Sequence, residues 1–200
     1  ENKLSDDCRK NLLATARVDI LEEENAALRQ TLSFAATRKY KTVGAEVVGT
    51  GATYPRDYLI IDRGEKDGIS AGQAVIAMDG YLIGKIARTE NDISIVQLLG
   101  DHQSRVAAAT LGDAPARGLL EGGYGISVRM NLIPQNDTIR VGDMVVTSGI
   151  EDKIPHGLLV GQVEVVEKEI YQPFQRAVIA PTIDGRRQRL VSVIIGQSNL

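Results

Sequence analysis

The segment whose residue types and spacing most suggest chemistry is Gly68-Ile69-Ser70-Ala71-Gly72, a Gly-x-Ser-x-Gly match. In a hydrolase this spacing forms a strained turn between a strand and a helix, from which the serine attacks its substrate. Here a charged turn precedes the segment and a strand-like run, Ala74 to Met78, follows it, so no helix is available. A similar turn recurs later in the chain with Arg140 in the place of the serine. We therefore interpret Ser70 as a turn residue and not as a nucleophile.

The two histidines and the one cysteine offer little further chemistry. His102 lies in a polar turn, His156 lies in a Pro-His-Gly loop, and Cys8 is far away near the N-terminus. A serine or cysteine protease needs a histidine and an acid beside its nucleophile, and a structural zinc ion needs several cysteine or histidine ligands. The sequence therefore predicts no catalytic residues, no metal site and no cofactor. A single cysteine does not decide the redox compartment.

Composition excludes several other kinds of site. The chain has no Gly-x-x-x-x-Gly-Lys phosphate loop, no tryptophan and only 8 aromatic residues, so we expect no small-molecule substrate. Its 23 basic and 26 acidic side chains give a net charge of −3, which gives no general attraction to nucleic acid or anionic lipid. A hydrophobic content of 43% with 24% charged residues is typical of a folded domain, which excludes global disorder.

The first element needed to position any site is a long N-terminal helix. All 20 glycines and all 6 prolines lie at or after Gly44, and both residue types disrupt helices. We expect residues 1–41 to form a coiled-coil helix, with heptad a positions at Leu4, Asn11, Val18, Asn25 and Leu32 and d positions at Asp7, Ala14, Leu21, Leu28 and Ala35.

The heptads predict self-association, as a parallel homodimer or a higher oligomer. In this register, charges of opposite sign pair between chains at the flanking positions, and an asparagine in the seam favours a parallel dimer. The candidate self-association residues are Arg17, Val18, Leu21, Glu22, Glu24, Asn25, Leu28, Arg29 and Leu32. Apolar residues also recur at the c position, at Leu13, Ile20, Ala27 and Phe34. An amphipathic helix lying on its own globular domain is the alternative.

The rest of the chain has the pattern of an all-β region. From Val43 onward, 11 or 12 short β-branched runs are bounded by glycine, aspartate or asparagine, which predicts barrels or a sandwich. No run of 18 apolar residues occurs, so we expect no membrane-spanning helix in this sequence. The chain begins with Glu1, which we interpret as the start of a fragment or of a processed chain.

An internal duplication predicts two related small β-barrels. At an offset of 70 residues, Asp67, Ile69, Gly72 and Val75 match Asp137, Ile139, Gly142 and Val145. Later, residues 82–86 resemble residues 159–163, and Arg105-Val106 and Leu190-Val191 lie near the end of each copy. We expect a first barrel over residues 42–113 and a second over 114–200. Terminal strands could be exchanged between the two.

Several phrases in this order resemble the MreC family of rod shape-determining proteins. The segment Leu59 to Gly72 looks like the family's Asp-(Lys/Arg)-Gly-x-x-(Asp/Asn)-Gly phrase, and the second half contains Val-Gly-Asp-Met-Val-Val-Thr-Ser-Gly at Val141 to Gly149. Further phrases are Asp79–Gly84, Asp101–Val106 and Pro155–Gly161. The resemblance covers about residues 10–195.

The resemblance implies a fold, a place in the cell and a set of partners. Members have one transmembrane helix, then a coiled coil and two β-barrels in the periplasm. They act without catalysis as scaffolds of the elongation machinery that builds peptidoglycan. The implied partners are MreD, MreB, RodA and penicillin-binding protein 2. This sequence lacks the membrane helix, so we expect a periplasmic segment that an upstream helix anchors to the inner membrane.

Two other classes of protein stay open at this point. A periplasmic adaptor of an export system also joins helices to β-domains. That class needs a helical hairpin inserted within a lipoyl-like domain, whereas the single helix here is terminal. A chymotrypsin-like hydrolase also has two barrels but needs a catalytic triad.

Overall fold

A computed structural model describes residue 17 and residues 40–53, 56–78, 80–124, 127–169 and 171–197. The chain divides into two compact units, Glu1–Arg38 and Lys39–Leu200. Most of the expected coiled coil over residues 1–41 falls in the first unit, where Arg17 alone is described and has an exposed side chain, whereas Tyr40 and Lys41 belong to a strand. The other candidate self-association residues, Val18, Leu21, Glu22, Glu24, Asn25, Leu28, Arg29 and Leu32, lie outside the described residues.

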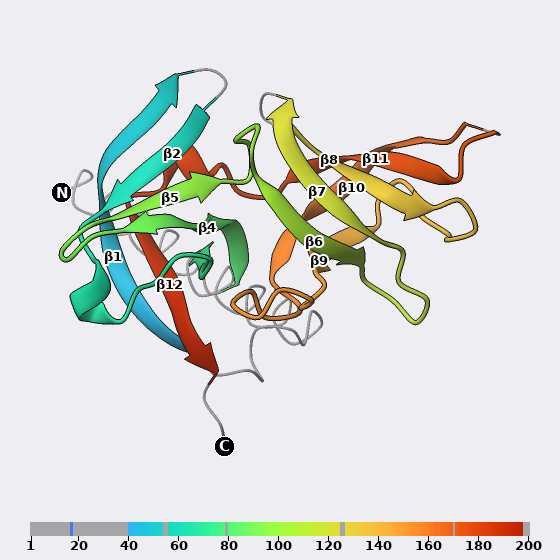
Figure 1. The fold of residues 1–200 in the computed structure, drawn as a ribbon. Helices are drawn as coiled ribbons and strands as arrows, with labels where there is room; N and C mark the ends of the chain where they lie inside the picture. Colours follow the sequence, from blue (N-terminus) through green and yellow to red (C-terminus); the bar gives the residue numbers. More distant parts are fainter. Residues whose placement is uncertain are drawn as a thin grey trace, which may run out of the picture. The chain divides into compact units, whose positions relative to one another are not determined.

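The described part of the second unit is mainly β, as the sequence predicts. Its strands are β1 (Tyr40–Thr53), β2 (Arg56–Ile61), β3 (Ala74–Ala77), β4 (Tyr81–Thr89), β5 (Ser94–Leu98), β6 (Arg105–Thr110), β7 (Arg117–Tyr124), β8 (Ser127–Pro134), β9 (Met144–Thr147), β10 (Leu159–Glu167), β11 (Phe174–Pro181) and β12 (Leu190–Gln197). Two 3-10 turns, η1 (Glu65–Asp67) and η2 (Gly185–Arg187), complete the described elements (Figure 1). No described helix is long and apolar enough to cross a membrane.

Six of these strands pair in a closed order that we call the first ring. Antiparallel pairing runs from β1 to β2, β5, β4, β3 and β12 and then returns to β1. Inward side chains alternate with outward ones, as in β5, where Ser94, Val96 and Leu98 are buried. One apolar cluster fills this ring, with Leu59, Ile61, Val75, Ile86 and Val193 among its members.

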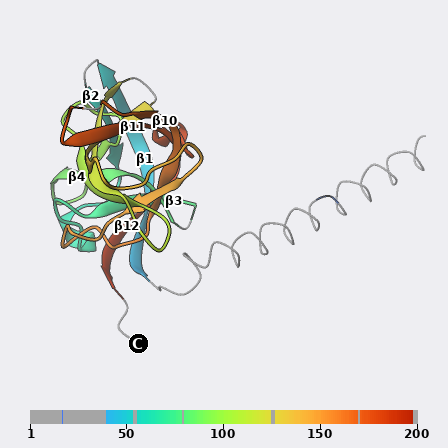
Figure 2. The ribbon, with the colours of Figure 1, turned by 90° about the vertical axis from the view of Figure 1, so that its right-hand side faces the viewer.

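The other six strands pair in the same way and form the second ring. Its order runs from β6 to β7, β8, β11, β10 and β9 and returns to β6. A separate apolar cluster fills it, including Val106, Leu120, Met130, Val145 and Ile179. That cluster also takes in residues of β3, β4 and β12, so side chains of the first ring contribute to the second core. The two rings lie side by side in Figure 1 and overlap in the view of Figure 2, which is turned by 90°. β4 meets β10 in one parallel pair, Tyr81 with Leu159.

One strand of each ring comes from the other half of the chain. β6 follows β5 of the first ring but pairs with β7 and β9, and it ends before the expected boundary at residue 113. β12 follows β11 of the second ring but pairs with β1 and β3. The two strands hold equivalent places. β12 lies between β1 and β3, and β6 lies between β7 and β9, which are the corresponding strands of the second ring. The chain therefore crosses between the rings twice.

The two turns that carry the repeated sequence also have the same backbone contacts. Gly72 and Gly142 have φ of 88° and 95°, which glycine adopts without strain. The Gly72 N–H donates to Ile86 O at 2.8 Å, and the Gly142 N–H donates to Val163 O at 2.9 Å. In both turns the residue two positions before glycine donates its N–H to the side chain of the residue that follows the glycine.

The sequence patterns missed β7 (Arg117–Tyr124), because it contains three glycines and no β-branched residue. These glycines instead permit close approach of neighbouring backbones. A Cβ on Gly118 would lie 2.6 Å from Asn131 O, and a Cβ on Gly122 would lie 2.2 Å from Asp101 O. Both positions therefore exclude any side chain while the strand continues its pairing with β6 and β8.

Candidate interaction surfaces

Ser70 contacts a lysine that sequence reasoning did not associate with it. Lys153 Nζ donates to Ser70 Oγ at 3.1 Å and to Ala71 O at 2.8 Å. The contact joins a turn of the first ring to the loop between β9 and β10 of the second.

A second set of polar contacts supports the same loop. Lys85 Nζ donates to Arg105 O at 2.7 Å and lies 3.6 Å from Glu151 Oε2. Glu151 Oε1 accepts from the Ala107 N–H at 2.9 Å. β4, β6 and the loop around Glu151 are thus tied together, which fixes one ring against the other.

A buried carboxylate of β2 pairs with an arginine of η2. Asp57 is 6% exposed, and its Oδ2 accepts a hydrogen bond from Arg186 Nε at 2.8 Å. The Asp57 N–H donates to Oδ2 of Asp101, which is also buried. Arg186 belongs to a short basic run in the sequence, and no local pattern indicated that one of these arginines pairs with a buried acid 129 residues away.

The histidines take part in turn structure. His102 Nδ1 lies 3.7 Å from Asp101 Oδ1, and a Cβ on Gly123 would lie 3.2 Å from the His102 Cβ. The Tyr40 O–H donates to the His156 carbonyl at 3.3 Å. Within the part of the chain that the structure describes, no group of three or more His, Cys, Asp and Glu side chains could hold a metal ion.

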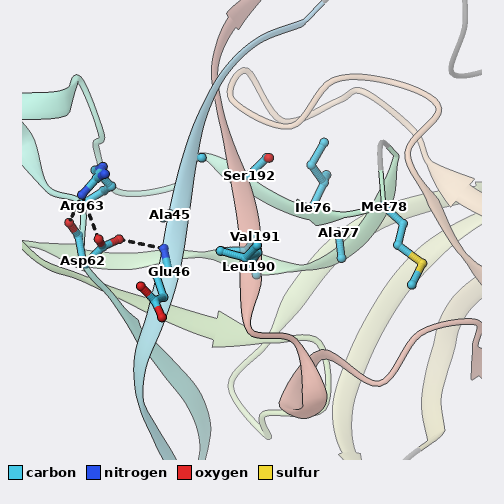
Figure 3. Close-up of a pocket in the computed structure, with 11 residues that line it drawn as sticks. Ala45, Glu46, Asp62, Arg63, Ile76, Ala77, Met78, Leu190, Val191 and Ser192 are labelled. Carbon is cyan, nitrogen blue, oxygen red and sulfur yellow. Dashed lines mark hydrogen bonds and ion pairs between the residues drawn. The ribbon is translucent and has the colours of Figure 1, made fainter.

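A groove of about 510 Å³ crosses β1, β12 and β3. Asp62 and Arg63 lie at one end of it and Met78 at the other, with Glu46 and Leu190 between them (Figure 3). The Glu46 N–H donates to Asp62 Oδ1 at 2.7 Å, and Arg63 Nη1 lies 2.9 Å from Asp62 Oδ2. The charged end is thus internally bonded, while the other end is apolar and open.

Two exposed apolar residues, Met78 and Leu132, have a positive φ, which is rare for residues other than glycine. Met78, at the groove, is 71% exposed and has φ of 46°. Leu132, in a bulge of β8, is 54% exposed and has φ of 58°. Near it, the exposed Phe174 of β11 pairs with Pro134 of β8. Bulky residues rarely adopt this conformation, and bulges re-aim side chains, so both positions are candidates for binding.

Comparison with known protein families gives one assignment. Residues 47–195 match the family model described as rod shape-determining protein MreC, barrel core. The matched range begins within β1 and ends within β12, so it covers both rings.

Individual relatives agree with the family model. The cell shape-determining protein MreC of Listeria monocytogenes is 32% identical over 169 residues, which cover 82% of this chain and 57% of that protein. The chain therefore spans little more than half the length of this curated relative. A solved structure of MreC from the same organism has a TM-score of 0.72 and 28% identity, and the match covers 98% of this chain and 97% of that one.

A more distant likeness concerns a complex. A chain from the solved complex between penicillin-binding protein 2 and MreC from Helicobacter pylori has a TM-score of 0.63. The match covers 78% of this chain and 99% of that chain. Its identity of 14% means that this likeness shows the fold alone.

Proposed function

The chain belongs to the MreC family of rod shape-determining proteins, and on that premise we propose that it acts as a scaffold of the machinery that builds the wall during cell elongation. The observation that carries the proposal is the match of the family model to residues 47–195. The curated relatives that this chain matches are named for cell shape determination.

The scaffold acts without catalysis of its own. The repeated turn supports this view, because Arg140 stands in the place of Ser70 there. Ser70→Ala should leave both the fold and the shape function intact, since Arg140 takes the equivalent place in the other turn. Loss of rod shape by a folded Ser70→Ala variant would contradict the proposal.

The scaffold works in the periplasm, anchored to the inner membrane by a helix upstream of this sequence. Its partners are MreD, MreB, RodA and penicillin-binding protein 2. The solved complex of the Helicobacter pylori protein with penicillin-binding protein 2 supports the last of these, because this chain shares that protein's fold.

The two rings act as two related β-barrels, and the strands β6 and β12 are exchanged between them. The closed pairing orders and the paired turns at Gly72 and Gly142 support this division. The chain first crosses from one ring to the other between Leu98 and Arg105, where β5 ends and β6 begins. It crosses back between Pro181 and Leu190, where β11 ends and β12 begins.

The N-terminal segment joins two chains in parallel through a heptad seam. The seam comprises Val18, Leu21, Asn25, Leu28 and Leu32, flanked by the charged pairs Arg17–Glu22 and Glu24–Arg29 between chains. A parallel pair would carry both sets of barrels away from the same membrane.

A chimera tests the function. Residues 47–195 would replace the matching region of the Listeria monocytogenes relative, in cells depleted of their own protein. Rod-shaped cells are the expected result. A chimera that is folded and present at normal levels but leaves the cells round would overturn the proposal.

A further inference from the structure

We propose that the groove crossing β1, β12 and β3 is the docking site for an extended segment of a partner protein, one with an apolar residue two positions from a basic one, so that both side chains lie on the same face of the segment. This inference rests on the proposed scaffold function and names the surface that would carry it. The backbone of β12 favours an extended segment. The exposed side chains of Met78 and Leu190 favour an apolar residue, and the carboxylate of Glu46 favours a basic one.

The backbone of β12 has an open edge at the groove. The Val47 N–H donates to Arg189 O at 2.9 Å, and bonded pairs alternate along an antiparallel ladder. Leu190, which lies opposite Glu46, therefore directs its N–H and C=O away from β1 and toward β3. The described pairing of β12 with β3 ends at Ser192 and Ile76, so Leu190 lies beyond it. An extended chain can bond to such an edge.

Met78 is the reason that the two strands separate. Its φ of 46° turns the chain out of β3 just where the next pair with Leu190 would form. A left-handed conformation is unfavourable for a side chain of this size, so the surrounding fold must maintain it. The result is a seam flanked by the two large apolar side chains Met78 and Leu190, which are 71% and 72% exposed.

The floor of the groove has room for a side chain. Gly44 and Ser192 lie opposite each other on β1 and β12, and both line the groove. A Cβ placed on Gly44 would meet no atom within 4 Å. An apolar side chain laid over this floor would contact Met78 and Leu190 and remove them from water.

The charges at the other end favour a basic residue. Two carboxylates line the groove there, from Glu46 and Asp62, beside the guanidinium of Arg63. Arg63 already interacts with Asp62 and Asp67, at 2.9 Å and 3.9 Å. The exposed carboxylate of Glu46 is thus the group best placed to meet a lysine or arginine of the partner.

The first test blocks the groove and uses a matched control. The probe is a fluorescein-labelled peptide, Val-Thr-Val-Thr-Lys-Thr with a C-terminal amide, in which the two valines and the lysine share one face of the extended chain, and binding to the full chain is measured by anisotropy. Gly44→Leu should weaken binding at least tenfold, or about 1.4 kcal/mol, because leucine occupies the floor. Gly196→Leu should change it less than about twofold, because Gly196 also has open space at its Cβ and lies on β12 away from the groove.

The second test reverses the charge. Glu46→Lys should weaken binding of this peptide and strengthen binding of the same peptide with glutamate in place of lysine. A peptide with proline in place of the second valine should bind weakly to every variant, because proline has no N–H to donate. Amide resonances of Leu190 and Ser192 should shift when the first peptide is added.

Several outcomes would overturn the proposal. These are no binding of the lysine peptide to the wild-type chain at millimolar concentration, equal loss with Gly44→Leu and Gly196→Leu, or no preference change with Glu46→Lys. Shifts at Leu190 that follow protein concentration without peptide would assign the groove to a second copy. Tighter peptide binding by Phe34→Ala would assign it to the chain's own N-terminal segment. Rod-shaped chimeric cells alongside any of these results would reject the groove and keep the scaffold function.

Discussion

At the scale of single residues, the described part of the chain relies on contacts between positions far apart in sequence. Asp57 and Arg186 are 129 residues apart, and Ser70 and Lys153 are 83 apart. Both contacts bring the carboxyl half of the chain onto the first ring. Substitutions at these residues therefore test the tertiary arrangement and not local structure.

Arg186→Ala should lower the free energy of unfolding by about 1–3 kcal/mol, because it leaves the buried Asp57 carboxylate without its charged partner. Arg187→Ala is the matched control. Its partner Asp184 is partly exposed and its own side chain is 85% exposed, so a change below about 1 kcal/mol is expected. Urea unfolding of both variants measures the difference. Equal effects would show that the Asp57 contact contributes nothing special.

Gly122→Ala should destabilise the chain by about 1–3 kcal/mol, because its Cβ would lie 2.2 Å from Asp101 O and the backbone would have to shift. Gly196→Ala, where the added Cβ meets nothing within 4 Å, should be neutral or slightly stabilising. Thermal unfolding distinguishes the two. If the variants unfold at the same temperature, close approach does not explain glycine in β7.

Only part of the candidate site could be predicted from residue patterns in the sequence. The sequence alone rejected Ser70 as a nucleophile, from the absence of a helix after it and from Arg140 in the repeat. It gave no indication of the groove. That feature depends on the φ of Met78 and on where β12 stops pairing with β3, and neither has a local sequence signal.

At the scale of elements, the strands followed from alternation and from turn residues, and β7 was the exception. It has no β-branched residue, and its Gly118, Gly122 and Gly123 are of the type that normally weakens a strand. The close contacts that require those glycines come from β8 and from the turn at Asp101, which are non-local. Strand propensity alone could not have identified them.

The N-terminal segment gives the prediction that belongs to this scale. Leu21→Asp with Leu28→Asp should give a monomer with intact β structure, because two charges would enter the proposed seam. Asn25→Leu should strengthen association, but the chains should then associate in more than one register or in more than one oligomeric state. Sedimentation measures both.

Two results would reject the seam. One is a wild-type chain that is already monomeric at tens of micromolar concentration. The other is a double-aspartate variant that remains a dimer. The apolar residues Leu13, Ile20 and Phe34 would then become the better candidates for contact.

At the scale of the whole β unit, the chain crosses between the two rings before β6 and again before β12. Internal repetition is visible in sequence, because the turns at Gly72 and Gly142 need the same residue types. Membership of a ring is not visible in sequence, because neither β6 nor β12 carries a local signal for its pairing partners. Only the pairing partners distinguish them.

The two rings should therefore unfold in one transition. Val193→Asp, which places a charge in the first core, should lower the stability of both rings together, since β12 links them. Hydrogen exchange of β5 and β8 amides measures the two rings separately. Protection lost in β5 but kept in β8 would show that the rings are independent.

The pairing of Tyr40 with Gln197 brings the two ends of the β unit to adjacent positions. Any tension applied between these ends would load the β1–β12 pair first and would open it from the ends inward, residue by residue. The second ring lies outside that path, so it would carry no load until β12 had peeled away from β1. A short linker could also join the two ends and allow new termini elsewhere, which makes this unit a natural subject for circular permutation.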